Sequence, residues 1–369
     1  MVITEEDSVQ YSGIRERLGE LCYGSGLLRV LQRTRSWVRQ DLRILAYHRV
    51  LTVQDSNAFD FDLDLVSTSA DGFREQMQLL QRDFSPTALG DVIAALDAGT
   101  RLPTNAVVVT FDDGYDDNYR VAYPILRELG VPATFFVSTS HIDSGRPFGY
   151  DWLVHMILRA PVQRLVLPEL DLDLPMPPLR AERRQLASQV LRRMKGFGDA
   201  VQSSIIGRLE RDWQMPSDAG HPDCRPMSWD ALREMKASGF EIGSHGVGHC
   251  MLAKLPPEQL EAELVESRAA LERELGEPAI LLSYPVGGDL AFDRRVMEAT
   301  MAAGYQAACS YICGTNPQSA LNRYALHRLP VERVMGTGWF AAMLTLPELM
   351  GYPTVSRIGK SEQVHACSY

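Results

Sequence analysis

The sequence predicts an α/β fold in which a parallel sheet closes into a barrel and is covered by helices. From residue 42 onward, short apolar runs rich in β-branched residues alternate with amphipathic helical segments. Such alternation is typical of parallel strands joined by helical crossovers. The number of strand–helix units favours a barrel over an open sheet. In either architecture, functional residues gather at the carboxyl ends of the strands.

The predicted elements follow one another in a regular order. Strands are expected at 42–48, 107–111, 133–137, 240–244, 279–285, 305–310 and 328–334, and helices at 73–82, 89–96, 119–129, 229–237, 260–275 and 293–303. Ser228 is the expected N-cap of helix 229–237. Gly130 and Gly276 are expected to close the helices that precede them.

The N-terminal segment differs from the rest of the chain. Residues 14–43 hold seven arginines against three acidic residues, and large apolar residues recur there at roughly helical spacing. One interpretation is a helix that packs on the main domain. The other is a basic amphipathic helix that makes a peripheral contact with an anionic membrane surface. The sequence leaves both interpretations open.

Composition divides the chain into three parts. Residues 1–41 form the N-terminal segment, residues 42–345 the main domain, and residues 346–369 a C-terminal tail. A stretch rich in proline and then arginine breaks the alternation within the main domain. We expect a helical insertion there, at about residues 140–226.

Bulk properties exclude several classes of function. The net charge of -10 gives no electrostatic basis for binding nucleic acid. Six cysteines without a CxxC pair argue against a zinc ribbon and a disulfide scaffold. The start of the chain lacks the apolar core of a secretory signal, and no apolar run approaches membrane-spanning length. The expected location is the cytoplasm, or the inner face of the membrane.

Two adjacent aspartates, Asp112 and Asp113, close the apolar strand 107–111. Like charges at the end of a buried strand are costly unless a positive charge stabilises them. Asp116 and Asp117 follow, and a helix-capping role suits them well. Capping suits the first pair poorly, because that pair comes directly off the strand.

A second polar cluster follows strand 240–244, where His245 and His249 lie four residues apart. A lone pair at this spacing is more often structural. Here the strand ends are expected to bring it level with Asp112 and Asp113. Two histidines and one carboxylate are a common ligand set for catalytic zinc. The sequence therefore predicts a divalent metal site, with zinc the expected ion.

Four motifs together resemble the polysaccharide deacetylase family, also called the NodB homology domain or carbohydrate esterase family four. They are AYHRV (46–50), TFDDG (110–114), SHGVGH (244–249) and SYPVGG (283–288). The resemblance extends over residues 42–334 and is closest to the poly-N-acetylglucosamine deacetylase branch. It implies a distorted (β/α) barrel, and an enzyme that removes N-acetyl groups from a glycan or its lipid-linked precursor.

The resemblance also implies roles for individual residues. Asp113, His245 and His249 match the metal ligands, and Asp112 matches the general base. Tyr284 and Pro285 match the third motif, which contacts the substrate and provides a backbone N–H for the oxyanion.

The proton donor for the departing amine remains open between two histidines. His327, in ALHRL, is the nearest match to the family's late motif, and His48, in AYHRV, is the second candidate. Trp152 is a weak match to the family's aromatic motif beside the base.

Two departures from the family pattern raise alternatives. Gly246 stands where the second motif usually has a hydroxyl residue, which predicts weaker metal binding. The arginine that orients the base is absent from the third motif. A barrel amidohydrolase acting on a small non-sugar amide is one alternative. A catalytically weak glycan-binding protein is the other.

Overall fold

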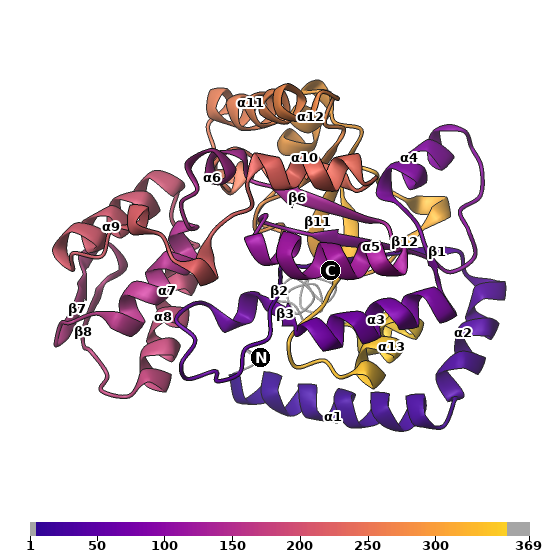
Figure 1. The fold of residues 1–369 in the computed structure, drawn as a ribbon, viewed down its shortest axis with the longest axis horizontal. Coiled ribbons are helices and arrows are strands. Elements are labelled where there is room, and N and C mark those ends of the chain that lie inside the picture. Colours follow the sequence, from indigo (N-terminus) through magenta and orange to yellow (C-terminus); the bar gives the residue numbers. More distant parts are fainter. Residues whose placement is uncertain (1–4, 353–369) are drawn as a thin grey trace, which may run out of the picture.

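The structure is a computed structural model that describes residues 5–352 (Figure 1). Most of the predicted C-terminal tail, from residue 353 onward, lies outside the described residues.

Seven parallel strands of the described chain close into a barrel. They run in the order β1–β5–β6–β9–β10–β11–β13, and β13 pairs back onto β1. Their bounds are β1 (Asp41–Tyr47), β5 (Ala106–Phe111), β6 (Ala133–Val137), β9 (Glu241–Ser244), β10 (Leu281–Ser283), β11 (Ala307–Cys313) and β13 (Leu326–Pro330). Every residue of β1 and β5 is buried, as expected of strands covered on both faces. The predicted barrel is confirmed.

The remaining strands are short and lie outside the barrel. β4 (Ser85–Pro86) extends the sheet beside β5, and β12 (Asn316–Pro317) pairs antiparallel with β1. β2 (Arg49–Val50) pairs with β3 (Val66–Thr68), and β7 (Arg164–Leu167) pairs with β8 (Leu172–Pro175).

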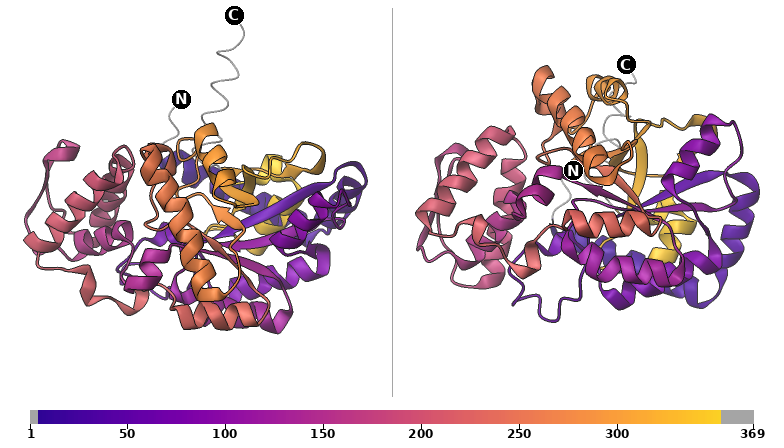
Figure 2. Two further views of the ribbon diagram at one scale, coloured as in Figure 1. Left: turned by 90° about the horizontal axis from the view of Figure 1, so that it is seen from above. Right: turned by 45° about the horizontal axis from the view of Figure 1, so that its top comes forward.

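Helices surround the barrel (Figures 1 and 2). They are α3 (Ala70–Asp83), α4 (Leu89–Asp97), α5 (Tyr123–Leu129), α6 (Thr139–Ser144), α10 (Trp229–Ala237), α11 (Pro257–Leu275), α12 (Arg294–Ala302), α13 (Thr337–Thr345) and α14 (Pro347–Met350). The predicted caps are confirmed. The Ser228 hydroxyl accepts a hydrogen bond from the Ala231 N–H, and Gly130 and Gly276 close α5 and α11 with φ of 63° and 75°.

Three strands differ from their predicted bounds by two residues or more. One of them, predicted at 305–310, begins at Ala307 and ends at Cys313. The strand predicted at 328–334 begins earlier and ends at Pro330, because the chain then turns, with the Met335 N–H bonded to the Glu332 carbonyl. The strand predicted at 279–285 is shorter and covers only β10.

The segment predicted as an insertion forms α7 (Gly149–Arg159), α8 (Arg180–Met194), α9 (Asp199–Asp212) and the β7–β8 pair. These elements lie together at the left of the barrel in Figure 1. They enclose an apolar cluster of their own, which includes Leu153, Ile157, Leu165, Ala187 and Ile205.

The N-terminal residues form two helices, α1 (Glu5–Gly24) and α2 (Leu27–Val38). α1 packs closely on α13, since a Cβ atom added at Gly19 would lie 2.7 Å from the Trp339 Cα. This contact agrees with the interpretation of residues 14–43 as a docked helix. Within residues 5–352, no helix combines the length and apolar character needed to cross a bilayer.

Candidate active site

The loops after β5 and β9 bring the two predicted clusters together at the carboxyl ends of the strands. Asp112 continues β5, and its N–H donates to the Tyr47 carbonyl at the end of β1 (2.9 Å). Six non-glycine residues of the described chain have a positive φ, and Asp113, His249 and Val286 are among them, in the loops after β5, β9 and β10. Strained backbone clusters at functional sites, so these loops are the strongest candidates for one.

Asp113, His245 and His249 form a compact group whose ligand atoms all lie within 4.8 Å of one another. The Asp113 Oδ1 is 3.4 Å from Nε2 of His245 and 3.3 Å from Nε2 of His249. Nδ1 of His245 lies 2.8 Å from the Ser283 carbonyl oxygen. A hydrogen bond donated there leaves Nε2 available to a metal. One carboxylate and two imidazoles, one of them oriented by a backbone carbonyl, fit a divalent metal ion.

Arg328 on β13 holds Asp112 by two parallel hydrogen bonds. Nη1 donates to Oδ1 at 2.8 Å and Nη2 to Oδ2 at 2.6 Å, and both side chains are buried. The guanidinium also donates to the hydroxyls of Thr110 and Ser283 and to the Ser310 carbonyl. The third motif does not supply an arginine to Asp112, as expected, but Asp112 is nevertheless held by one. The arginine comes from β13 instead of the third motif.

Positive partners keep both aspartates ionised. Burial alone raises the pKa of Asp113, but hydrogen bonds from His245 and His249 outweigh it and hold that pKa well below its ordinary value. Burial likewise raises the pKa of Asp112, and the Arg328 charge more than offsets it, so the net pKa is also lowered. The two adjacent carboxylates therefore face different partners.

The loop that carries both histidines is anchored without the usual hydroxyl. Gly246 has a φ of 77°, which Ser or Thr would adopt only with strain. The Glu263 carboxylate on α11 accepts hydrogen bonds from the N–H groups of Val247 (2.7 Å) and Gly248 (3.1 Å). The Ser244 hydroxyl accepts another from the Gly246 N–H (3.0 Å). These hydrogen bonds hold the loop in place even though Gly246 has no hydroxyl group.

His48 lies near enough to the two aspartates for their charges to act on its imidazole. It follows β1 directly, and its ring centroid is 5.4 Å from that of Tyr311. Burial lowers the pKa of His48, while the charges of Asp113 and Asp112 act in the opposite direction. Of the two candidate proton donors, His48 is the one that the fold brings to the aspartates.

His327 is not brought to this group. Side chains alternate along a strand, so His327 and Arg328 point to opposite faces of β13, and Arg328 points to Asp112. The His327 imidazole lies beside Gly314, and its backbone N–H donates to the Asn316 side chain (2.8 Å). The predicted role of His327 as proton donor does not fit this position.

Tyr284 also differs from its predicted role. Its N–H donates to the Cys309 carbonyl (3.0 Å), and its hydroxyl donates to the Tyr324 carbonyl (2.9 Å). Its ring stacks on Phe292 in an apolar cluster between helices and sheet. Neither its N–H nor its ring is available to a substrate. Pro285 is buried in the turn that follows, and a proline has no N–H to donate.

Tyr150, on the first turn of α7, was not predicted. Its hydroxyl donates to Oδ2 of Asp113 (3.0 Å), the oxygen that does not face the histidines. Its ring centroid lies 5.2 Å from that of His249. No local pattern indicated this role, because Tyr150 belongs to the insertion. Trp152, the weak motif match nearby, instead donates to the Met215 carbonyl and lies in the insertion's apolar cluster.

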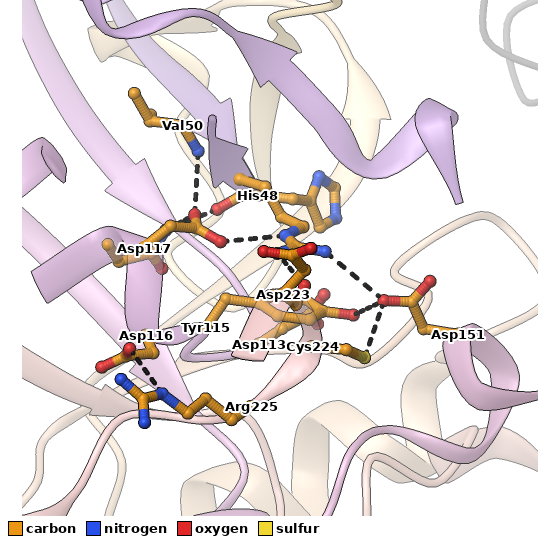
Figure 3. A network of polar contacts seen from close by, with 12 residues as sticks. His48, Val50, Asp113, Tyr115, Asp116, Asp117, Asp151, Asp223, Cys224 and Arg225 are labelled. Atoms are coloured by element: carbon orange, nitrogen blue, oxygen red, sulfur yellow. Dashed lines mark hydrogen bonds and ion pairs between the residues drawn. The ribbon is translucent and has the colours of Figure 1, made fainter. Parts of the chain in front are cut away.

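A buried ionic network ties the insertion to the aspartate loop (Figure 3). Arg49 donates to Asp117 (2.9 Å), lies 3.6 Å from Asp151, and stacks 4.4 Å over the Tyr115 ring. Asp151 also accepts hydrogen bonds from the Tyr115 hydroxyl and the Cys224 thiol. Since Asp151 adjoins Tyr150, this network fixes the start of α7 against the loop that holds Asp113.

The network also corrects the capping interpretation. Asp117 makes no side-chain cap; its carboxylate accepts from Arg49 and from the Val50 N–H. Asp116 pairs with Arg120 and Arg225 at the surface.

Comparison with known proteins decides the family. A profile described as polysaccharide deacetylase matches residues 99–308, more than half of the chain. The chain belongs to the polysaccharide deacetylase family.

Individual family members are distant. The chain is 23% identical over 241 residues to YxkH of Bacillus subtilis (strain 168), which is named as a polysaccharide deacetylase. The aligned residues make up 64% of this chain and 56% of that protein. It is 32% identical over 109 residues to the poly-beta-1,6-N-acetyl-D-glucosamine N-deacetylase of Escherichia coli (strain K12). That alignment covers 29% of this chain and 15% of the relative. The chain thus spans about half of the first relative and a small part of the second.

The solved structure of Streptococcus pyogenes deacetylase PplD in complex with acetate has the same fold. It superposes with a TM-score of 0.53 at 17% identity, over 80% of this chain and 93% of that one. The barrel architecture of the deacetylases is therefore shared.

Proposed function

We propose that this protein is a metal-dependent hydrolase that removes N-acetyl groups from an amino-sugar glycan or its lipid-linked precursor. One observation carries the proposal: Asp112 lies next to the Asp113–His245–His249 group, yet Arg328 holds it apart from that group. The reaction needs one carboxylate for the metal and a second for a proton. The name of the Escherichia coli relative supports the substrate class.

Asp113, His245 and His249 would hold the metal, with zinc the proposed ion because two histidines and a carboxylate are a common catalytic zinc set. When bound, the ion would polarise the acetyl carbonyl and lower the pKa of a water. Tyr150 would keep Oδ1 of Asp113 turned toward the histidines by holding Oδ2.

Asp112 would accept the proton of the attacking water. Its carboxylate is ionised, and each oxygen retains a lone pair after the bond to Arg328. His48 would donate a proton to the departing amine, which requires it to become charged. Burial lowers the pKa of His48 overall, and the carboxylates of Asp113 and Asp112 partly offset that effect. A backbone N–H of the turn at 286–288 would bind the oxyanion.

The experiment measures acetate released from N-acetylglucosamine oligomers. We expect release by the metal-loaded protein, loss on chelation, and recovery when zinc is added back. Asp112→Asn should lower kcat by about 10²–10⁴-fold, and His245→Ala should lower the bound metal measured by elemental analysis.

Asp116→Asn is the matched control, because Asp116 is a neighbouring aspartate that pairs with surface arginines. It should retain activity and metal. Acetate release that persists both in chelator and in Asp112→Asn would refute the mechanism. Release from a small non-sugar amide, with none from the oligomers, would favour the amidohydrolase alternative.

A further inference from the structure

Exposed apolar side chains concentrate on the two N-terminal helices. Among the described residues, six of the large exposed hydrophobic side chains lie between residues 14 and 37, and ten are scattered over the rest. The six are Ile14, Leu18, Leu21, Leu27, Val30 and Trp37. We call them the outer face. α1 and α2 lie along the lower and right-hand edges of the molecule in Figure 1.

The apolar residues of α1 form a stripe turned away from the protein. Ile14, Leu18 and Leu21 follow the i, i+4, i+7 spacing of one helical face, and they are 51%, 49% and 70% exposed. The residues that contact α13 lie on another face, where Gly19 meets Trp339. Docking on the barrel therefore does not account for the stripe.

α2 also has apolar residues on a side turned away from the protein. Leu28 and Gln32 are buried against the protein. Leu27, Val30 and Trp37 lie on the opposite side, and Trp37 is 86% exposed. A tryptophan side chain this exposed does not gain the favourable free energy of burial, which indicates that another surface covers it.

Positive charge flanks the α2 part of this surface, although the whole chain carries a net charge of -10. Residues 27–40 contain four arginines and no acidic residue. Arg35 and Arg39 pair with Glu348, and Arg29 lies 3.8 Å from Asp83. Arg33 is exposed and has no ion-pair partner among the described residues.

We propose that the outer face binds peripherally to a bilayer surface that contains anionic phospholipids. Interfacial helices combine apolar residues with arginines and tryptophan, as α2 does. A second copy of the chain fits less well as the partner. Pairing two outer faces would bring the arginines of residues 27–40 from both copies close together. This proposal does not depend on the enzymatic activity.

The test is co-sedimentation of the full-length protein with vesicles. Vesicles of phosphatidylcholine that contain phosphatidylglycerol should bind it, and pure phosphatidylcholine should bind much less. Arg33→Glu should lower the partition coefficient on the order of tenfold. The double variant Val30→Ser/Trp37→Ser should lower it at least as much, since it removes the apolar contact.

Two exposed residues elsewhere provide matched controls. Met301→Ser on α12 and Arg211→Glu on α9 make the same kinds of change away from the outer face. They should bind like the unmodified protein. Circular dichroism should be unchanged for all variants.

Several results would overturn the proposal. They are no binding to anionic vesicles, equal binding to neutral vesicles, or binding that survives both outer-face variants. A dimer in gel filtration that Val30→Ser/Trp37→Ser dissociates, without vesicle binding, would assign the face to a second copy instead.

Discussion

The ion pair between Arg328 and Asp112 offers the sharpest test of the site. Arg328→Met removes a guanidinium that is fully buried and makes two charge-assisted hydrogen bonds, at 2.8 and 2.6 Å, to a carboxylate that is 2% exposed. The Thr110 and Ser283 hydroxyls lose a donor at the same time. The variant keeps most of the side-chain volume, so it tests mainly the charge.

The expected cost follows from leaving a buried charge unpaired. Removing one member of a buried ion pair typically costs about 3–5 kcal/mol, a large share of a typical stability of about 5–15 kcal/mol. Asp112→Asn alone should also be destabilising, because it leaves Arg328 buried without its counter-charge. In Asp112→Asn/Arg328→Met neither charge remains, so the double variant should lose much less than the sum of the two single losses.

The assay is urea unfolding of all four proteins in chelator, which gives a double-mutant cycle. Arg164→Met, in a pair that is exposed on both sides, is the control and should cost little. If the losses from Arg328→Met and Asp112→Asn add to within about 0.5 kcal/mol, the two residues are not coupled and the reasoning fails.

The same variant should change the pH dependence of stability. In the native protein the pKa of Asp112 is lowered, so its contribution is present above its unfolded pKa and is lost as pH falls through the folded one. Without Arg328, burial remains and raises the pKa of Asp112. The deficit of Arg328→Met should therefore grow from about pH 4 to about pH 7. A deficit that shrinks over this range would contradict the assigned charge state.

Three further predictions concern neighbouring residues. Tyr150→Phe removes the hydrogen bond to Asp113 and should weaken metal binding about 10–100-fold in a chelator competition titration; unchanged affinity would remove Tyr150 from the site. His48→Ala should lower kcat by about 10²–10⁴-fold, whereas His327→Ala should change it little, and the reverse result would restore His327 as proton donor. Burial and the neighbouring Asp151 raise the pKa of the Cys224 thiol well above its ordinary value. Iodoacetamide followed by mass spectrometry should therefore leave Cys224 unmodified in the native protein and label it after unfolding.

Local pattern was sufficient to predict the barrel and the proximity of Asp113, His245 and His249. Parallel strands covered on both faces are apolar runs, so β1 and β5 were evident from their composition. Asp113 and His245 come directly after strands, and the carboxyl ends of parallel strands meet at one edge. Their proximity therefore follows from topology alone.

Contacts that depend on closure of the barrel could not be predicted in the same way. Arg328 is 216 positions from Asp112, and no local pattern relates the two. They meet because β1 pairs with both β13 and β5. Tyr150 comes from an insertion whose position beside Asp113 is fixed by the buried Arg49 network.

The two motif departures illustrate why residue-by-residue matching underestimated this site. The alternative of a catalytically weak protein depends on Gly246 and on the absence of an arginine from the third motif. In the structure, other elements fill both roles, since Glu263 on α11 anchors the histidine loop and Arg328 on β13 holds Asp112. A motif records which residue fills a role in most relatives. The chemistry requires only that a carboxylate or a guanidinium reach the same point in space, and a closed barrel offers several strands from which it can do so. The departures are therefore no reason to prefer a binding protein over an enzyme.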